Sequence, residues 1–134
     1  MSTKVEFNCL PTAIGSMSHT DAGEACRLVT KYLGEVPHWP QLPKRSQLEN
    51  MYVQFSEGFP GLVLEGTKLF VEREDDFDAQ LEALFTAASD DKADDYGISE
   101  KYAAGLHALA ATKLRAPRVI KGQVTGPKIG RAHV

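Results

Sequence analysis

The stretch that decides the fold is residues 10–16, LPTAIGS, where a short apolar run ends in a glycine and a hydroxyl residue. Far along the chain a second apolar run ends in a similar way, at residues 121–127, KGQVTGP. Small and hydroxyl residues at the end of a strand are typical of the ligand-facing corners at the carboxyl ends of strands in α/β barrels. The two stretches therefore predict two strands that each end in a ligand-facing corner.

Helical patterns account for much of the chain between these corners. The first helix is expected to begin near Asp21, because Asp21 and Glu24 fit a capping box and an apolar stripe at helical spacing follows. A second helix is predicted from near Asp76, where apolar residues again recur at helical spacing. A third helix is predicted from Ser99, and Pro117 ends it.

The region between the first two helices contains prolines and turn signals. Residues 36–45, VPHWPQLPKR, hold three prolines and predict an extended, rigid segment. Apolar runs at residues 51–55, 61–65 and 68–72, separated by glycine turns, predict a β-hairpin or small meander. The order strand, helix, hairpin, helix, helix, strand is typical of a parallel α/β arrangement.

The chain of 134 residues suits one ordinary domain, whereas a complete barrel needs eight strand–helix units and about 250 residues. We therefore expect an α/β fold in which residues 1–127 are an incomplete N-terminal portion of a (β/α)8 TIM-barrel catalytic domain with an inserted β-hairpin. Residues 129–134, IGRAHV, match one reading frame of a widely used sequencing adapter, whose first two bases can complete the codon of Lys128. Residues 128–134 are therefore interpreted as a read-through tail.

Composition restricts the classes of partner. The net charge of −3, without a clustered basic face, argues against nucleic acid. No apolar stretch is long enough to span a membrane, and the first residues lack the apolar core of a signal peptide. Cys9 and Cys26 show no paired metal spacing, which indicates two free thiols in a reducing compartment. We expect a cytoplasmic protein whose partners are small molecules, not nucleic acid or membrane.

Several polar residues near the corners are candidates for a site. Gly15 and Ser16 offer backbone N–H groups and a hydroxyl that can hold a carboxylate, although an ordinary tight turn has the same pattern. His19 is a candidate for substrate contact or acid–base work, and a loop histidine is also commonly structural. Lys121 lies in an otherwise apolar run, so it either neutralises a carboxylate or extends its ammonium group to solvent.

The proline segment has two interpretations. Four of its side chains place an aromatic face beside amide and cationic groups, which would suit an anionic pocket; they are Trp39, Gln41, Lys44 and Arg45. The alternative is a packed surface loop without a ligand.

The two corners resemble a known group of enzymes. Residues 10–16 followed by His19 and Thr20 resemble the opening of the catalytic barrel of cobalamin-independent methionine synthases. Residues 121–127 resemble the Lys-Gly-x-x-Thr-Gly-Pro that ends the next major strand of that barrel. Residues 39–55 are closer to shorter members of the methionine synthase II and uroporphyrinogen decarboxylase-like superfamily. The resemblance covers about residues 10–127.

The resemblance implies roles for five residues. Ile14, Gly15 and Ser16 would hold the amino-acid part of an acceptor such as homocysteine, and Lys121 and Thr125 would lie at the barrel mouth. It also implies a zinc ion that makes the acceptor thiol a thiolate, and a folate or corrinoid methyl donor. The zinc ligands of the family would follow the fragment, which holds no assigned catalytic residue and only His19 as a candidate. Residues 17–19, MSH, replace the usual Phe-Pro-Gln or Phe-Pro-Arg, which leaves the acceptor open.

The expected function is that of a methionine synthase-like, zinc-dependent methyltransferase of methionine biosynthesis, of which this chain is an N-terminal fragment inactive by itself. One alternative is a uroporphyrinogen decarboxylase-like enzyme, which needs no metal. Another is a small non-enzymatic α/β binding module, which predicts that residues 1–127 unfold cooperatively without further chain.

Overall fold

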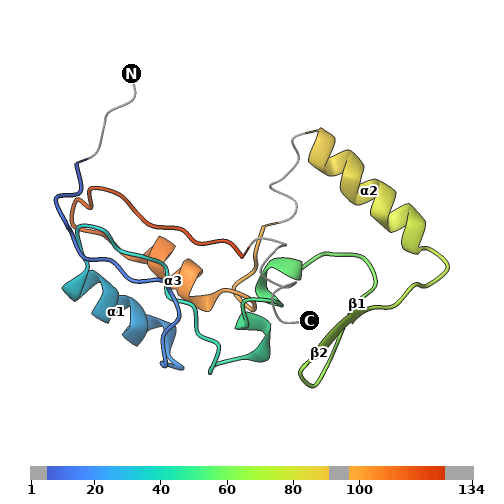
Figure 1. Cartoon of the computed structure of the whole chain (residues 1–134), viewed down its shortest axis with the longest axis horizontal. Helices are drawn as coiled ribbons and strands as arrows, with labels where there is room; N and C mark the ends of the chain where they lie inside the picture. The colour runs from blue at the N-terminus through green and yellow to red at the C-terminus, as the bar shows by residue number, and fades with distance from the viewer. Residues whose placement is uncertain (1–5, 91–96, 126–134) are drawn as a thin grey trace.

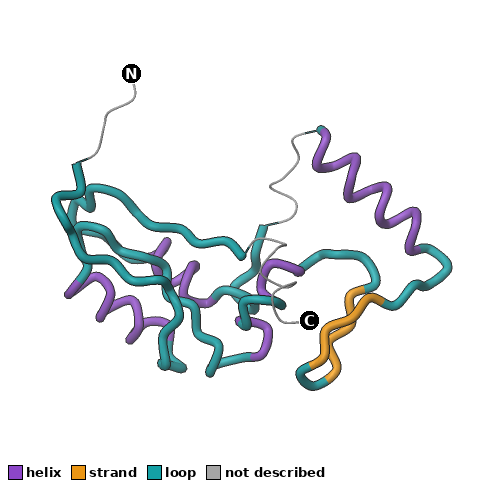
Figure 2. Tube along the Cα trace, viewed as in Figure 1, coloured by secondary structure: helices purple, strands orange, loops and turns teal. Residues whose placement is uncertain are grey.

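The computed structural model describes residues 6–90 and 97–125 (Figures 1 and 2). These residues form a small α/β domain with three helices and one two-stranded antiparallel sheet. None of these helices is both long and apolar enough to cross a membrane. The interpreted tail, residues 128–134, lies outside the described residues. The element order is α1 (Ala22–Tyr32), η1 (Gln47–Glu49), η2 (Gln54–Ser56), β1 (Leu62–Glu65), β2 (Lys68–Val71), α2 (Phe77–Ser89) and α3 (Ala104–Ala111).

Helix α1 begins where the sequence predicts. The Asp21 carboxylate accepts a hydrogen bond from the Glu24 backbone N–H at 2.6 Å, which satisfies one of the unpaired donors of the first turn. Glu24 in the first turn and Lys31 in the last turn both complement the helix dipole. The inner face is apolar, with Cys26 and Val29 buried, so the predicted stripe is the face that packs on the rest of the domain.

The core lies where α1 and α3 pack together. Cys26, Trp39 and Leu109 are buried in one apolar cluster, and the Phe55 ring meets Trp39 edge-on at 6.4 Å between centroids. Helix α3 lies directly on the proline segment, since a Cβ atom added at Gly105 would overlap the carbonyl oxygen of Pro40. A glycine is therefore required at this point of α3.

The proline segment is the buried centre of the domain, not a surface loop. Residues 36–42 are all buried. The Gln41 N–H donates to the Gly15 carbonyl at 3.0 Å on one side, and the Lys121 N–H donates to the Pro37 carbonyl at 2.8 Å on the other. We call residues 13–17, 35–42 and 118–123 the three extended segments. They lie side by side in that order.

The neighbouring segments run parallel, as the two bridges Ser16–Gln41 and His38–Lys121 show. They form isolated bridges rather than a regular sheet. Two prolines in the central segment, Pro37 and Pro40, lack the N–H that a continuous ladder needs.

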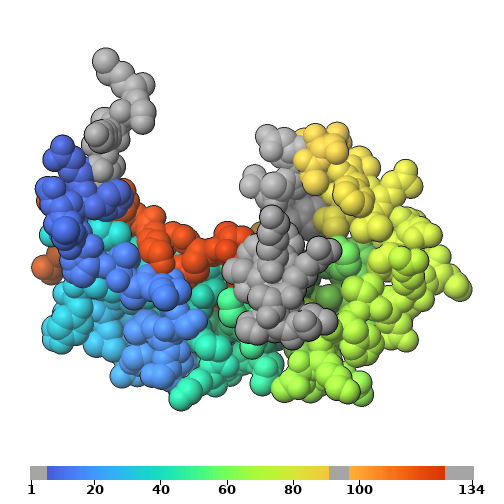
Figure 3. Space-filling view, in the orientation of Figure 1, coloured from blue at the N-terminus to red at the C-terminus, as the bar shows by residue number. Residues whose placement is uncertain are grey.

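The prediction that residues 118–124 form a buried strand is wrong, because this segment lies at the surface. Ile120 is 56% exposed and Val124 is 79% exposed. In the described part of the chain, the backbone bonds of this segment go to residues 35–37 on one side only. Figure 3 shows it lying across the outside of the body that contains α1 and α3.

The predicted hairpin is confirmed, with β1 and β2 antiparallel from Leu62–Val71 to Glu65–Lys68. The further strand expected at residues 51–55 is wrong, because that stretch forms turns and η2. Local hydrogen bonds replace a ladder there: the Asn50 side chain accepts from the Tyr52 N–H at 3.0 Å.

The second predicted helix is confirmed as α2, which stands away from α1 and α3 (Figure 1). The third begins at Ala104, not at Ser99 as predicted. The Ala103 N–H donates to the Ser99 carbonyl at 2.9 Å, but Ala103 itself has a non-helical φ of −148°, which interrupts the helix at that residue. Residues 99–103 therefore form a turn before the helix.

Candidate functional site

Polar side chains gather where the three extended segments end. Ser16 lies next to the end of the first segment, Gln41 lies next to the end of the second, and Gln123 ends the third. We call Gly15 and these three residues the carboxyl-end cluster. The hydroxyl of Ser16 belongs to an exposed residue, so a ligand can reach this edge.

Gly15 is required by the packing of the cluster. It is buried and has a φ of +148°, a conformation that L side chains rarely adopt. A Cβ atom here would lie 2.7 Å from Cδ of Gln123 and 3.2 Å from Oε1 of Gln41. The glycine predicted to form a ligand-facing corner therefore also makes room for two glutamine side chains.

The glutamines form short hydrogen-bonded links. Gln41 donates to the side-chain oxygen of Gln54 at 2.6 Å, and Gln54 donates to the Tyr102 carbonyl at 2.7 Å. Gln123 donates to the Trp39 carbonyl at 2.8 Å, while its own Oε1 is buried and has no hydrogen-bond partner among the described residues. Buried polar atoms are usually paired, so this oxygen is an acceptor open to a donor.

Sequence reasoning missed Gln54 and Gln123. A signal for Gln123 was present, because it is an uncharged polar residue inside the apolar run that ends in the second corner. Gln54 lies in a stretch interpreted as a strand, where nothing local indicated a buried amide.

Lys121 joins the two corners. Its Nζ donates to the Ala13 and Ile14 carbonyl oxygens, both at 2.6 Å. Among the described residues the ammonium group meets no carboxylate, and these two hydrogen bonds hold it against the first corner. The lysine instead fixes the backbone just before Gly15, so two motifs far apart in sequence become one structural unit.

Two histidines carry buried ring nitrogens. His38 is 2% exposed, and neither of its ring nitrogens has a partner among the described residues. Burial, together with the positive charge of Lys121, lowers the pKa of His38 below its usual value. Its neutral ring borders an apolar hollow of about 280 Å³ between α1 and the first extended segment. His19 is half-buried, and its Nδ1 is also buried without a hydrogen-bond partner among the described residues.

The other residues that were predicted to form a site lie outside the carboxyl-end cluster or are held by other contacts. Ile14 is 86% exposed, and Thr125 is half-buried beyond the end of the third extended segment. The anionic pocket expected on the proline segment does not form: Trp39 is part of the core, and the Arg45 guanidinium is held by the buried Glu49 carboxylate at 2.7 Å. Contacts within the domain therefore occupy Trp39 and Arg45, two of the residues that were expected to line a pocket for an anion.

The cluster consists of hydroxyl and amide groups, which donate and accept hydrogen bonds. Within residues 6–90 and 97–125, no group of three or more His, Cys, Asp and Glu side chains could hold a metal ion. These residues do not fit a zinc site, and no reaction step is assigned to one. Burial raises the pKa of the Cys26 thiol, which makes it a poor nucleophile near neutral pH.

Comparisons with protein-family models, curated proteins and solved structures find no match to this chain. The donors and acceptors of the cluster suit a small polar ligand, since a few placed polar groups are what fix orientation in such sites.

Proposed function

We propose that the carboxyl-end cluster binds the amino-acid part of a thiol acceptor of the homocysteine type, as one part of a methionine synthase-like methyltransferase. The observation that supports this most is the contact between the two corner motifs. Lys121 bonds to the two carbonyls that precede Gly15, and Gln123 packs against Gly15 itself. The motif resemblance leads us to expect both corners at one binding edge.

The cluster offers complementary groups for an α-amino acid. The exposed Ser16 hydroxyl can donate to a carboxylate oxygen, and the unpaired Oε1 of Gln123 is an acceptor that suits an ammonium group. A charged group held by such bonds gains more than a neutral one. The residues of this chain bind and orient the acceptor, while the thiolate-forming and methyl-donating groups are not assigned to them.

The finer fold that we propose is the N-terminal part of a (β/α)8 barrel with an inserted hairpin. Support comes from the parallel direction of the three extended segments and from exposed apolar residues in the outer two and directly after the third. Ile14, Ile120 and Val124 are 86%, 56% and 79% exposed. Apolar side chains on an open strand edge favour pairing with further chain.

A titration tests the proposed function on the whole chain. L-homocysteine and L-2-aminobutyrate, which lacks the thiol, are added separately while backbone and side-chain amide signals are followed by NMR. Both should shift the signals of Gly15, Ser16 and Gln123, because the cluster recognises the amino-acid part. 4-Mercaptobutyrate, which lacks only the amine, should bind more weakly.

A matched pair of variants locates the site. Ser16→Ala should weaken homocysteine binding by about tenfold, the effect of losing one hydrogen bond to a charged group. Ser18→Ala removes an exposed hydroxyl two residues away and should leave binding unchanged. Equal losses in both variants, or no shift at the cluster with either amino acid, would show that the proposal is wrong.

A further inference from the structure

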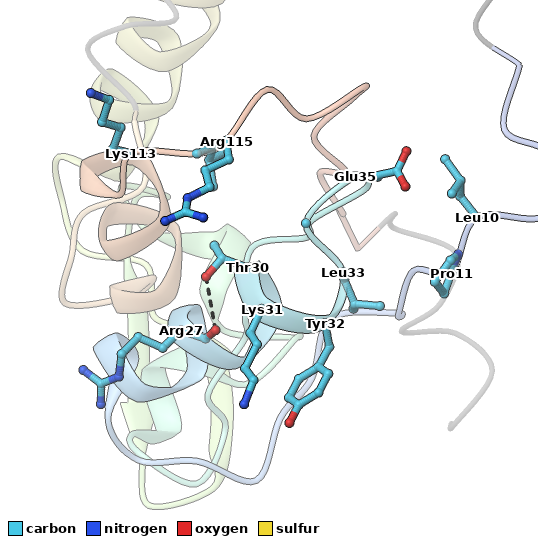
Figure 4. Close-up of a pocket in the computed structure, with 12 residues that line it drawn as sticks. Leu10, Pro11, Arg27, Thr30, Lys31, Tyr32, Leu33, Glu35, Lys113 and Arg115 are labelled. Atoms are coloured by element: carbon cyan, nitrogen blue, oxygen red, sulfur yellow. Dashed lines mark hydrogen bonds between the residues drawn. The ribbon is translucent and has the colours of Figure 1, made fainter.

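A second hollow lies at the other ends of the three extended segments. Its volume is about 680 Å³, within the usual range of about 300–1,000 Å³ for small-molecule sites (Figure 4). The wall combines the second half of α1 with residues 10–11, which precede the first segment, and residues 113–115, which precede the third. The hollow is therefore separate from the carboxyl-end cluster.

Four cationic side chains line this hollow: Arg27, Lys31, Lys113 and Arg115. Among the described residues, none of them forms an ion pair with a carboxylate. Glu35 is the one acidic residue in the wall, and the Arg118 guanidinium holds it at 2.8 Å. The chain as a whole has a net charge of −3, so its composition does not explain this concentration of positive charge.

The charges come from two parts of the fold. Arg27 and Lys31 lie one turn apart on α1, and Lys113 and Arg115 follow α3. Figure 4 shows the Arg115 guanidinium directed toward Thr30, with Arg27 and Lys113 beyond it on opposite sides. Cations from two parts of the fold line the same hollow, so an anion with several charged groups can meet more than one of them.

We propose that this hollow binds a small polyanion, a molecule that carries two or more phosphate or carboxylate groups. Several separate cations favour several anionic groups over a single one. Two of the cations are guanidinium groups, whose planar donors suit phosphate and carboxylate oxygens equally. The Thr30 hydroxyl in the same wall already donates to the Cys26 carbonyl, so its oxygen contributes an acceptor and not a further donor.

Calorimetric titration of the whole chain tests this proposal. Inorganic pyrophosphate and citrate are used as separate probes, so that the two arms distinguish phosphate from carboxylate ligands. Inorganic phosphate, with a single phosphorus centre, is the comparison. At least one polyanion should bind about tenfold or more tightly than inorganic phosphate, and its affinity should fall as salt is added.

A charge-matched pair of variants locates the binding. Arg27→Gln combined with Arg115→Gln should weaken polyanion binding about tenfold or more, since two charged donors are lost. Lys68→Gln combined with Arg73→Gln removes the same charge from exposed positions in and after the hairpin. Thermal unfolding of both variants verifies that they remain folded.

Each outcome of these titrations either supports the polyanion proposal or overturns it. Loss of binding in the Arg27 and Arg115 double variant alone supports the proposal, and the probe that binds identifies the ligand class. Equal weakening in both double variants would indicate general charge attraction and overturn it. Absence of binding by both polyanions would overturn it as well. Homocysteine binding at the carboxyl-end cluster is a separate readout, so one proposal can fail without the other.

Discussion

Replacing Gly15 by alanine should disturb the carboxyl-end cluster more than any other single methyl group added there. The backbone at Gly15 has a φ of +148°, and the new Cβ atom would overlap the Gln123 amide nitrogen and lie 2.7 Å from its Cδ. Either the backbone must change its conformation or Gln123 must leave its place. In the second case the hydrogen bond from Gln123 to the Trp39 carbonyl is lost.

The two costs set the expected magnitude. Holding a residue with a side chain in a sparsely populated φ region costs about 1–3 kcal/mol. Losing a hydrogen bond such as that to the Trp39 carbonyl costs about 0.5–1.5 kcal/mol. Together they lower the free energy of unfolding by about 1.5–4.5 kcal/mol. This is a large part of the stability of an ordinary domain, about 5–15 kcal/mol.

Urea denaturation followed by tryptophan fluorescence measures this change. Trp39 is the only tryptophan, and it is buried beside the affected hydrogen bond. Gly122→Ala is the matched control: it lies in the second corner, and a Cβ atom there would meet nothing within 4 Å. Its free energy of unfolding should stay within about 0.5 kcal/mol of the original. If Gly15→Ala is no less stable than Gly122→Ala, the close packing of Gln123 against Gly15 does not exist.

Three further changes test the fold. Gly105→Ala should destabilise the chain by about 1–3 kcal/mol, because the added Cβ atom overlaps the proline segment. Gly23→Ala, which has space in α1, should stabilise the chain by up to about 1 kcal/mol. Equal effects of the two substitutions in thermal melts would contradict the packing of α3. Asp21→Ala should cost about 0.5–2 kcal/mol in the same melts, since the cap of α1 is lost, and an unchanged melt would argue against that cap. The pKa of His38 is lowered from 6.5, so below that pH the unfolded chain takes up a proton that the folded chain resists. The contribution of His38 to the free energy of unfolding should be constant above this pH and fall as the pH decreases below it. His38→Gln should remove this part of the pH dependence, whereas His107→Gln, at an exposed position, should leave it unchanged.

Local sequence signals predicted the elements that local contacts stabilise. The cap at Asp21 needs only a backbone N–H three residues away, and the hairpin of β1 and β2 needs only a two-residue turn at Gly66, with a φ of +59°. Each of these depends on groups close together in the chain. The third helix was predicted too early because Ala103, which is buried in the core, leaves the helical region with a φ of −148°.

The carboxyl-end cluster also has features that the sequence determines and features that only the tertiary structure decides. The sequence by itself determined that Gly15, Ser16 and Lys121 occupy corners that follow apolar runs. Only the tertiary structure decided that residues 36–42 lie between those runs, that Lys121 bonds to the first corner and that Gln123 packs on Gly15. These contacts join residues about a hundred positions apart in the chain. Their formation depends on which segment is buried in the middle, and that is decided by packing against α1 and α3 and not by the preference of any single residue.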